Sequence, residues 1–316
     1  MGEVGWDHAS FCASIPRDVR FRGVLVESAR AWRAGALGLG LGALVVACAP
    51  NLTTTGGAGG EGGGFGGAGA SGSSSSGGSG GNGGGDGGVI LCPQAPNTPV
   101  MVPIATAAGN YCIDSTEVTN NQYAAWLTSI AGSELFQEPE CSFNDSYVPA
   151  TGMAPPADDA PVTQIDWCDA VAFCLWHGKR LCGKIGGGPV PYIDVTNAAV
   201  SQWHNACSQG GQLFYPYGNA YASSACNGQD KGLGASAAVG SQSTCVGGFA
   251  GIFDLSGNVW EWEDACDGAT GENDTCRRRG GGYNSISSDL DCSTAGGSLR
   301  SAANPTTGFR CCVDNP

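Results

Sequence analysis

Histidine and charged residues, basic ones above all, are scarce in this chain. Only 3 His occur among 316 residues, and Asp, Glu, Lys and Arg together make up 13%. The three histidines, His8, His177 and His204, nearly exclude a metal site built from several imidazoles. The 14 Lys and Arg are outnumbered by 28 Asp and Glu, which gives a net charge of −14. This balance argues against binding to nucleic acid and against attachment to anionic lipid through a polybasic patch.

A hydrophobic run long enough to span a bilayer is also missing. The apolar run Leu37–Ala47 is too short, because a membrane helix needs about 20 apolar residues. Arg20, Arg22, Arg30 and Arg33 precede it, and it ends in Leu44-Val45-Val46-Ala47-Cys48, which resembles the bacterial lipobox. We therefore predict a lipoprotein signal peptide over residues 1–47 and lipidation of Cys48, which ties the exported protein to the bacterial cell envelope. The alternative is an ordinary apolar run with a chance cysteine. Met1–Val19 is long for the start of a signal, which a start codon assigned too far upstream would explain.

Glycine is abundant, with 54 residues, and much of it lies in one tract. Thr53–Gly88 is almost entirely Gly, Ser and Ala and has no apolar period. Such a segment buries too little surface to offset the entropy of ordering it. We predict that residues 48–88 form the lipidated cysteine and a disordered linker, and that residues 89–316 form one folded domain.

The 16 cysteines argue against a reducing cytosol. Without Cys12 and Cys48 fourteen remain, an even number that allows seven disulfides. A zinc site is the rival interpretation of a cysteine cluster. The spacings are irregular and contain no Cys-x-x-Cys pair, so disulfides are favoured.

Local patterns predict few regular elements. A strand is expected at Tyr111–Asp114, and helices are expected at Thr116–Ile130, Asp166–Gly178 and about Asn197–Ser208. Thr119 is a plausible N-cap of the first helix. After Ser208 the chain is rich in Gly, Asn and Ser and has little period. These patterns predict a disulfide-rich α+β domain with low regular secondary structure.

Several blocks in this domain resemble one family in their order along the chain. The most specific are Pro161–Leu181, which reads PVTQIDWCDAVAFCLWHGKRL, and Asp254–Trp262, which reads DLSGNVWEW. The others are Ile113–Asn120, Tyr215–Asn219, Arg279–Tyr283 and Gly308–Cys311. Together they resemble the formylglycine-generating enzymes, or sulfatase-modifying factors, across the whole folded domain. The resemblance implies a variant of the C-type-lectin-like fold. The family reads LPTEAEWE where this chain has Cys182–Gly188 and a later helix start, which indicates a loop insertion.

The resemblance also implies a chemistry that this chain lacks residues for. Active family members are copper-dependent oxidases that use O₂ to convert a sulfatase cysteine to formylglycine, and two cysteines five positions apart hold Cu(I). In one alignment these positions are Ser285 and Leu290, and in the other they are Gly282 and Ser287. Neither alignment supplies a thiol, and a hydroxyl does not replace a thiolate on Cu(I). We therefore expect no copper and no catalytic residues.

The resemblance implies two disulfides, Cys174–Cys311 and Cys207–Cys292. The remaining pairs are guesses: Cys226–Cys245, Cys266–Cys276, Cys168–Cys182, and Cys92, Cys112, Cys141 and Cys312 among themselves.

Calcium is the best metal candidate. By resemblance, Asp254 and Glu261 supply side-chain oxygens and Gly257 and Val259 supply carbonyls, a set that suits Ca²⁺. A weaker second site has Asn227 and the carbonyl of Gly228, with Asp230 as a marginal third ligand. Both sites would be structural. The alternative is that Glu261 only hydrogen-bonds backbone and the turn holds itself.

Three functions stay open at this point. The leading interpretation is a membrane-tethered, non-catalytic binding or scaffold module for a protein, peptide or glycan. The second is an oxidoreductase that generates formylglycine on cysteine peptides. The third is carbohydrate binding by analogy with lectins, which rests on fold alone.

Each histidine is expected to have a structural or surface role, and Trp260 and Trp262 are expected to pack rather than bind ligand.

Overall fold

The computed structural model describes residues 90–131, 133, 137–153 and 158–314, all within the unit Gly80–Pro316. The predicted signal peptide, Cys48 and the linker lie outside these residues. None of the helices in the described residues has the length and apolar character needed to cross a bilayer.

Two four-stranded sheets form the framework. The first has the order β1-β2-β8-β3 and is antiparallel throughout: β1 Met101–Ile104, β2 Tyr111–Asp114, β8 Cys311–Asp314 and β3 Arg180–Leu181. The second has the order β6-β5-β4-β7, in which only β4 and β7 run parallel: β6 Ala295–Leu299, β5 Thr275–Arg279, β4 Trp260–Cys266 and β7 Thr307–Phe309.

Three α-helices accompany the sheets: α1 Asn120–Ile130, α2 Trp167–Trp176 and α3 Gln202–Ser208. Each begins directly after a capping side chain, namely Thr119, Asp166 or Ser201. These caps accept hydrogen bonds from otherwise unpaired amides of the first turn, which explains where the helices start. The predicted strand at Tyr111–Asp114 matches β2. The first and third helices begin later than predicted, at Asn120 and Gln202. Short 3₁₀ turns are η1 Pro139–Cys141, η2 Gln229–Lys231 and η3 Ser287–Asp289.

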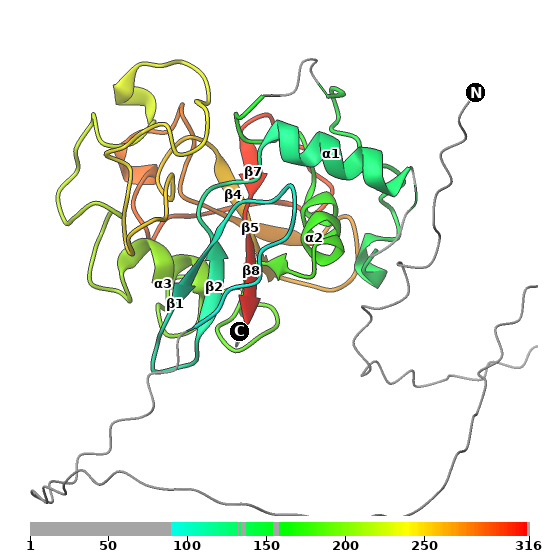
Figure 1. Ribbon diagram of the computed structural model, residues 1–316, viewed down its shortest axis with the longest axis horizontal. Coiled ribbons are helices and arrows are strands. Elements are labelled where there is room, and N and C mark those ends of the chain that lie inside the picture. Colours follow the sequence, from blue (N-terminus) through cyan, green and yellow to red (C-terminus); the bar gives the residue numbers. More distant parts are fainter. Residues whose placement is uncertain (1–89, 132, 134–136, 154–157, 315–316) are drawn as a thin grey trace, which may run out of the picture. The chain divides into compact units, whose positions relative to one another are not determined.

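Aromatic side chains form the main core between α1, α2 and β7. Phe173 of α2 stacks on Tyr123 of α1 with ring centroids 5.8 Å apart, and it meets Trp126 and Phe309 edge to face. A second core lies between the first sheet and α3 and includes Tyr111, Ile113 and Trp203. In Figure 1 the green helices α1 and α2 lie on one side, and the yellow, loop-rich segment 209–258 lies on the other.

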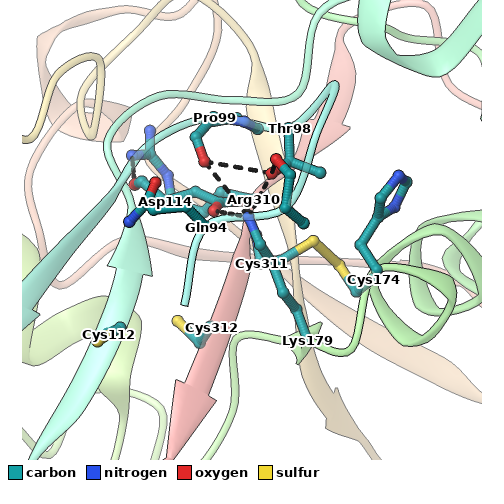
Figure 2. Close-up of polar contacts among 12 residues, drawn as sticks. Gln94, Thr98, Pro99, Cys112, Asp114, Cys174, Lys179, Arg310, Cys311 and Cys312 are labelled. Carbon is teal, nitrogen blue, oxygen red and sulfur yellow. Dashed lines mark hydrogen bonds and ion pairs between the residues drawn. A yellow bond between two sulfur atoms is a disulfide. The ribbon is translucent and has the colours of Figure 1, made fainter. Parts of the chain in front are cut away.

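A buried ion pair joins the GKRL block to the last residue of β2. Lys179 donates to the Asp114 carboxylate at 2.6 Å, to Thr98 Oγ1 at 3.0 Å and to the Pro99 carbonyl at 3.3 Å. Figure 2 shows these contacts beside the Cys174–Cys311 disulfide. Asp114 also accepts from the Cys311 amide at 2.9 Å. Each oxygen of this buried carboxylate therefore has a donor, which compensates for its lost hydration.

Candidate functional site

The DLSGNVWEW block forms a tight turn that leads into β4. Asp254, Gly257 and Asn258 all have positive φ angles, of 60°, 75° and 62°. A Cβ atom at Gly257 would lie 2.4 Å from the carbonyl oxygen of Asn227, and Asn258 donates its amide to that same oxygen at 2.8 Å. Glycine is therefore required at 257, because two loops meet there without space for a side chain.

Glu261, the last residue of the predicted first calcium site, is fully engaged by protein groups. Its two oxygens accept from Nε and Nη2 of Arg310, each at 2.7 Å, and Oε2 also accepts from Trp203 Nε1 at 2.8 Å. Both members of this pair are buried. Glu261 is thus held in a bidentate ion pair, which fixes its orientation.

Two more buried carboxylates lie close to Glu261. Burial raises the pKa of Glu117 well above its usual range, and the negative charges of Asp254 and Glu261 raise it further. Burial also raises the pKa of Asp254, to about 6, although the amide of Gly240 donates to it at 2.6 Å. Arg310 is the cation that opposes both shifts. This cluster has more negative than positive groups, an imbalance that a bound cation would correct.

Two oxygens beside Asn258 are buried without a hydrogen-bond donor. They are Oε2 of Glu117 and Oδ1 of Asn227. The other polar atoms of these groups are used: Asn258 donates to Glu117 Oε1 at 3.0 Å, and Asn227 donates to Asn258 Oδ1 at 3.1 Å. Hard oxygens left without donors are the kind of ligand that calcium takes, so these residues fit that ion.

Of the other expected ligands of the second calcium site, Gly228 lies beside Asn227 but Asp230 points elsewhere. Gly228 lies next to Asn227 and its carbonyl accepts from Lys231 at 3.1 Å, inside η2. Asp230 is exposed and accepts from the Tyr221 hydroxyl at 3.1 Å, so it is not directed to the buried oxygen of Asn227. In the described part of the chain, no three His, Cys, Asp or Glu side chains are arranged to hold a metal. A calcium site here would depend on amide and backbone oxygens.

Ser285 and Leu290, one of the two candidate pairs of copper positions, meet in space. A Cβ atom at Gly281 would lie 2.9 Å from Leu290 Cδ2 and 3.1 Å from Ser285 Cβ. Both side chains are buried, and Ser285 Oγ accepts the Gly282 amide at 3.0 Å. Gly282 adjoins the same place through this hydrogen bond, so both alignments stay open. An isobutyl group and a hydroxyl occupy this place.

All fourteen cysteines in the described residues form disulfides. The two pairs that the resemblance implies, Cys174–Cys311 and Cys207–Cys292, are both present. The guesses Cys226–Cys245 and Cys266–Cys276 are present too. No described cysteine is left as a thiolate for a metal, and seven disulfides indicate an oxidising, extracytoplasmic location.

The guess Cys168–Cys182 is wrong. Cys168 pairs with Cys141 and Cys182 pairs with Cys312, while Cys92 pairs with Cys112. Successive residues of a strand face opposite sides of the sheet. Cys311 of β8 therefore points into the core with α2, and Cys312 points into the core with α3, where Cys182 lies.

A family comparison agrees with this geometry. The model of the "Sulfatase-modifying factor enzyme 1-like domain" matches residues 87–315. The chain belongs to this family. Its disulfide-rich α+β fold is accordingly the sulfatase-modifying factor variant of the C-type-lectin-like fold.

Solved structures of similar fold are distant in sequence. A protein described as CarF is 20% identical with a TM-score of 0.46, over 65% of this chain and 86% of that one. PvdO from Pseudomonas aeruginosa is 18% identical with a TM-score of 0.45, over 65% and 80%. Treponema denticola variable protein 1 is 19% identical with a TM-score of 0.44, over 65% and 84%.

Two histidines of this sulfatase-modifying factor domain bond to backbone. His177 Nδ1 lies 2.8 Å from the Phe173 carbonyl, and His204 Nδ1 lies 2.7 Å from the Cys292 carbonyl. Burial lowers the pKa of both imidazoles. Trp262 is fully buried and donates to the Ile165 carbonyl, whereas Trp260 is half-buried with the Arg278 guanidinium over its ring.

Sequence reasoning missed two features near the site. Glu117 was grouped with a strand-and-helix block, although a carboxylate between the fully buried strand β2 and the buried Val118 is a signal of a buried charge. The second feature is a tyrosine cluster, in which Tyr215 stacks on Tyr217 at 5.4 Å and meets Tyr221 at 5.7 Å. All three rings are half-buried, and the exposed Phe214 precedes them.

Proposed function

We propose that this protein is an extracytoplasmic binding module of the sulfatase-modifying factor family that does not perform copper-dependent oxidation. The observation that carries the proposal is that all fourteen described cysteines are paired in disulfides, which leaves none of them as a thiolate for copper. Cu(I) prefers soft thiolate ligands, and neither a hydroxyl nor an alkyl group replaces them.

Copper binding and oxygen consumption test this proposal. The purified chain, not reduced, is titrated with Cu(I) against a colorimetric chelator and then assayed for O₂ uptake with a Cys-x-Pro-x-Arg peptide. We expect no tight copper and no peptide oxidation. The Ser285→Cys/Leu290→Cys double variant is the matched control, because it restores two thiols at one place. One equivalent of Cu(I) on the unaltered chain with oxidation of the peptide would establish the oxidoreductase instead.

The proposed attachment to the cell envelope is through lipid on Cys48. It is supported by the sequence Leu44–Cys48 and the Gly/Ser-rich segment that follows. A linker of this composition and about 35 residues has a root-mean-square span of roughly 30–35 Å, which holds the domain clear of a membrane surface. Mass spectrometry of the mature protein checks the proposal: we expect a diacylglyceryl cysteine at position 48, and an unmodified Cys48 peptide would contradict it.

Structural calcium is the second part of the proposal. By resemblance the proposed ligands are Asp254, Gly257, Val259 and Glu261 at the first site, and Asn227 and Gly228 at the second. At the first site Glu261 would have to share its oxygens with Arg310 and Trp203. The unpaired buried oxygen of Asn227 supports the second site. At a calcium concentration of 100 times Kd, binding stabilises a fold by about 3 kcal/mol. Removal of calcium by a chelator should lower Tm and speed amide exchange in residues 225–258, and unchanged exchange there would contradict the proposal.

Carbohydrate binding is a second candidate function, favoured by the half-buried tyrosines Tyr215, Tyr217 and Tyr221. Aromatic faces carry partial negative charge and attract the polarised C–H groups of a sugar ring. A glycan array tests this candidate, with Tyr221→Ala as the variant and Tyr192→Ala as the control. Binding that disappears in Tyr221→Ala alone supports it, and equal binding by both variants refutes it.

A further inference from the structure

A pocket of about 560 Å³ lies at the far end of β4 from the carboxylate cluster. One side of it is the apolar face of α2, with Trp167, Val171 and Leu175. The opposite side is the end of β4 and the loop after it, with Asp264, Cys266 and Asp267. The size is in the range of pockets that hold small organic groups. Nothing in the proposed function uses this pocket.

Four carboxylates line the pocket, and they come from two separate segments. Glu138 and Glu140 belong to the approach to η1 and to η1 itself, and Asp264 and Asp267 belong to β4 and its following loop. The Cys141–Cys168 disulfide ties η1 to the first turn of α2, beside Trp167. The segment of Glu138 and Glu140 is therefore tied to α2 by a covalent bond.

The two arginines of the pocket wall are already paired with carboxylates that do not line it. Arg180 donates to Asp314 at 2.8 Å and to Gln202 at 2.9 Å. Arg300 donates to Asp274 at 3.1 Å, and its guanidinium lies 4.4 Å from the ring centroid of Trp167. These partners offset part of the arginines' charge, and the four acidic residues that line the pocket outnumber its two arginines.

Asp264 lies at the end of β4, between the two glutamates and the two arginines in charge terms. In the described ranges no group donates a hydrogen bond to its side chain, and the residue is half-buried. Burial raises the pKa of Asp264 to about 6, and the charges of Glu138 and Glu140 add to that effect while Arg180 and Arg300 oppose it. A cation that enters the pocket would relieve this repulsion.

We propose that the pocket binds an alkylammonium cation, with the ammonium group at Asp264, Glu138 and Glu140 and the methylene stem on Trp167 and Leu175. A bare metal ion fits less well, because no three acidic side chains of the described segments are placed to chelate one. An ammonium head on an apolar stem matches both walls, since such side chains bury their methylenes and keep the charge among polar groups. The net charge of −14 attracts cations to the protein from a distance.

Titration of the purified chain with two ammonium probes tests the proposal and identifies the source of the cation. The probes are 1,5-diaminopentane and Nα-acetyl-lysine methylamide, and Nα-acetyl-norleucine methylamide is the uncharged control. Tighter binding of the diamine indicates a free polyamine, and tighter binding of the capped lysine indicates a peptide. Equal binding of lysine and norleucine, or no binding of any probe at millimolar concentration, overturns the proposal.

Substitution of the pocket carboxylate supplies the second readout. Asp264→Asn removes one charge at constant size, and we expect the affinity for the ammonium probe to fall roughly ten- to a hundredfold, the value of one hydrogen bond to a charged group. Asp145→Asn makes the same change at an exposed position and should leave the affinity unaltered. If Asp264→Asn does not fold, Glu138→Gln/Glu140→Gln replaces it, since both glutamates are only half-buried. An unchanged affinity in the folded variant refutes the site.

Discussion

The helical part of the domain and the segment 209–258 are stabilised in different ways. Helices α1 and α2 meet through aromatic rings, with Phe173 at the centre of four ring contacts. The segment 209–258 has one 3₁₀ turn and no strand, and its buried groups include Asn227, Asp254 and Asn258. Apolar packing holds the first region, and hydrogen-bonded loops with one internal disulfide hold the second. The comparison teaches that one domain can combine both means when most of its buried polar groups are paired, with Asn227 Oδ1 as the exception in this segment.

Removal of one disulfide from each region is expected to give the largest effects. Cys174→Ala/Cys311→Ala opens a loop of 137 residues, and Cys226→Ala/Cys245→Ala opens one of 19. In the first variant the Cys182–Cys312 bond still joins the same two chain segments, so chain entropy predicts a loss of about 3 kcal/mol in the free energy of unfolding for either variant. Cys174 and Cys311 also belong to the aromatic core, so the first variant should lose more. Denaturant unfolding measures both losses, and an equal or larger loss for the Cys226–Cys245 variant would contradict this expectation.

One substitution made in both regions tests the contrast in packing. Phe173→Ala removes a fully buried ring and should cost about 3–5 kcal/mol. Phe214→Ala removes a ring that is 63% exposed and should stay within about 0.5 kcal/mol. Thermal unfolding monitored by near-UV circular dichroism gives both values. Similar losses at the two positions would refute the division into an apolar and a polar half.

Glycines with similar φ angles test the close approach of the two loops. Gly257→Ala combines a φ of 75° with a Cβ 2.4 Å from the Asn227 carbonyl oxygen, and should cost about 3 kcal/mol. Gly234→Ala has a φ of 71° and open space around it, so about 1 kcal/mol is expected. Denaturant midpoints compare the two, and equal losses would mean that the loops separate without cost.

The smallest effect concerns pH and the N-cap of α2. Burial raises the pKa of Asp166 to about 6, above its ordinary value of 3.8. The folded state therefore holds this proton more tightly, and the stability that it contributes is present below pH 3.8 and lost as pH rises through about 6. Asp166→Asn keeps the N-cap, and the free energy of unfolding of this variant should decrease less steeply between pH 4 and 6. Asp145→Asn should keep the original slope, and an unchanged slope in Asp166→Asn would contradict the assignment.

Local signals in the sequence were sufficient for the elements but not for the tertiary pairings. Strand β2, the Thr119 cap and the helix after Asp166 follow from residues within a few positions of one another. The Cys182–Cys312 pair does not, because it depends on β3 and β8 meeting in one sheet from 130 residues apart.

The candidate site divides in the same way. The DLSGNVWEW turn is contiguous, so its residues were predictable as a group. Glu117 reaches them only through a hydrogen bond from Asn258, which lies 141 positions later in the chain. The pocket of Asp264 joins segments from Glu138 to Arg300, and no sequence spacing indicates that they meet. Which distant segments meet depends on the whole fold, so a pattern within one segment does not predict it.

The position of β8 has a consequence for biosynthesis. This strand lies between β2 and β3, and its neighbouring residues Cys311 and Cys312 crosslink to cysteines 137 and 130 positions earlier. A nascent chain emerges from its amino terminus, so the centre of the first sheet stays open until β8 has been synthesised. The domain is therefore expected to complete its fold only after β8 has emerged, with thiol oxidation at 311 and 312 as the step that closes it.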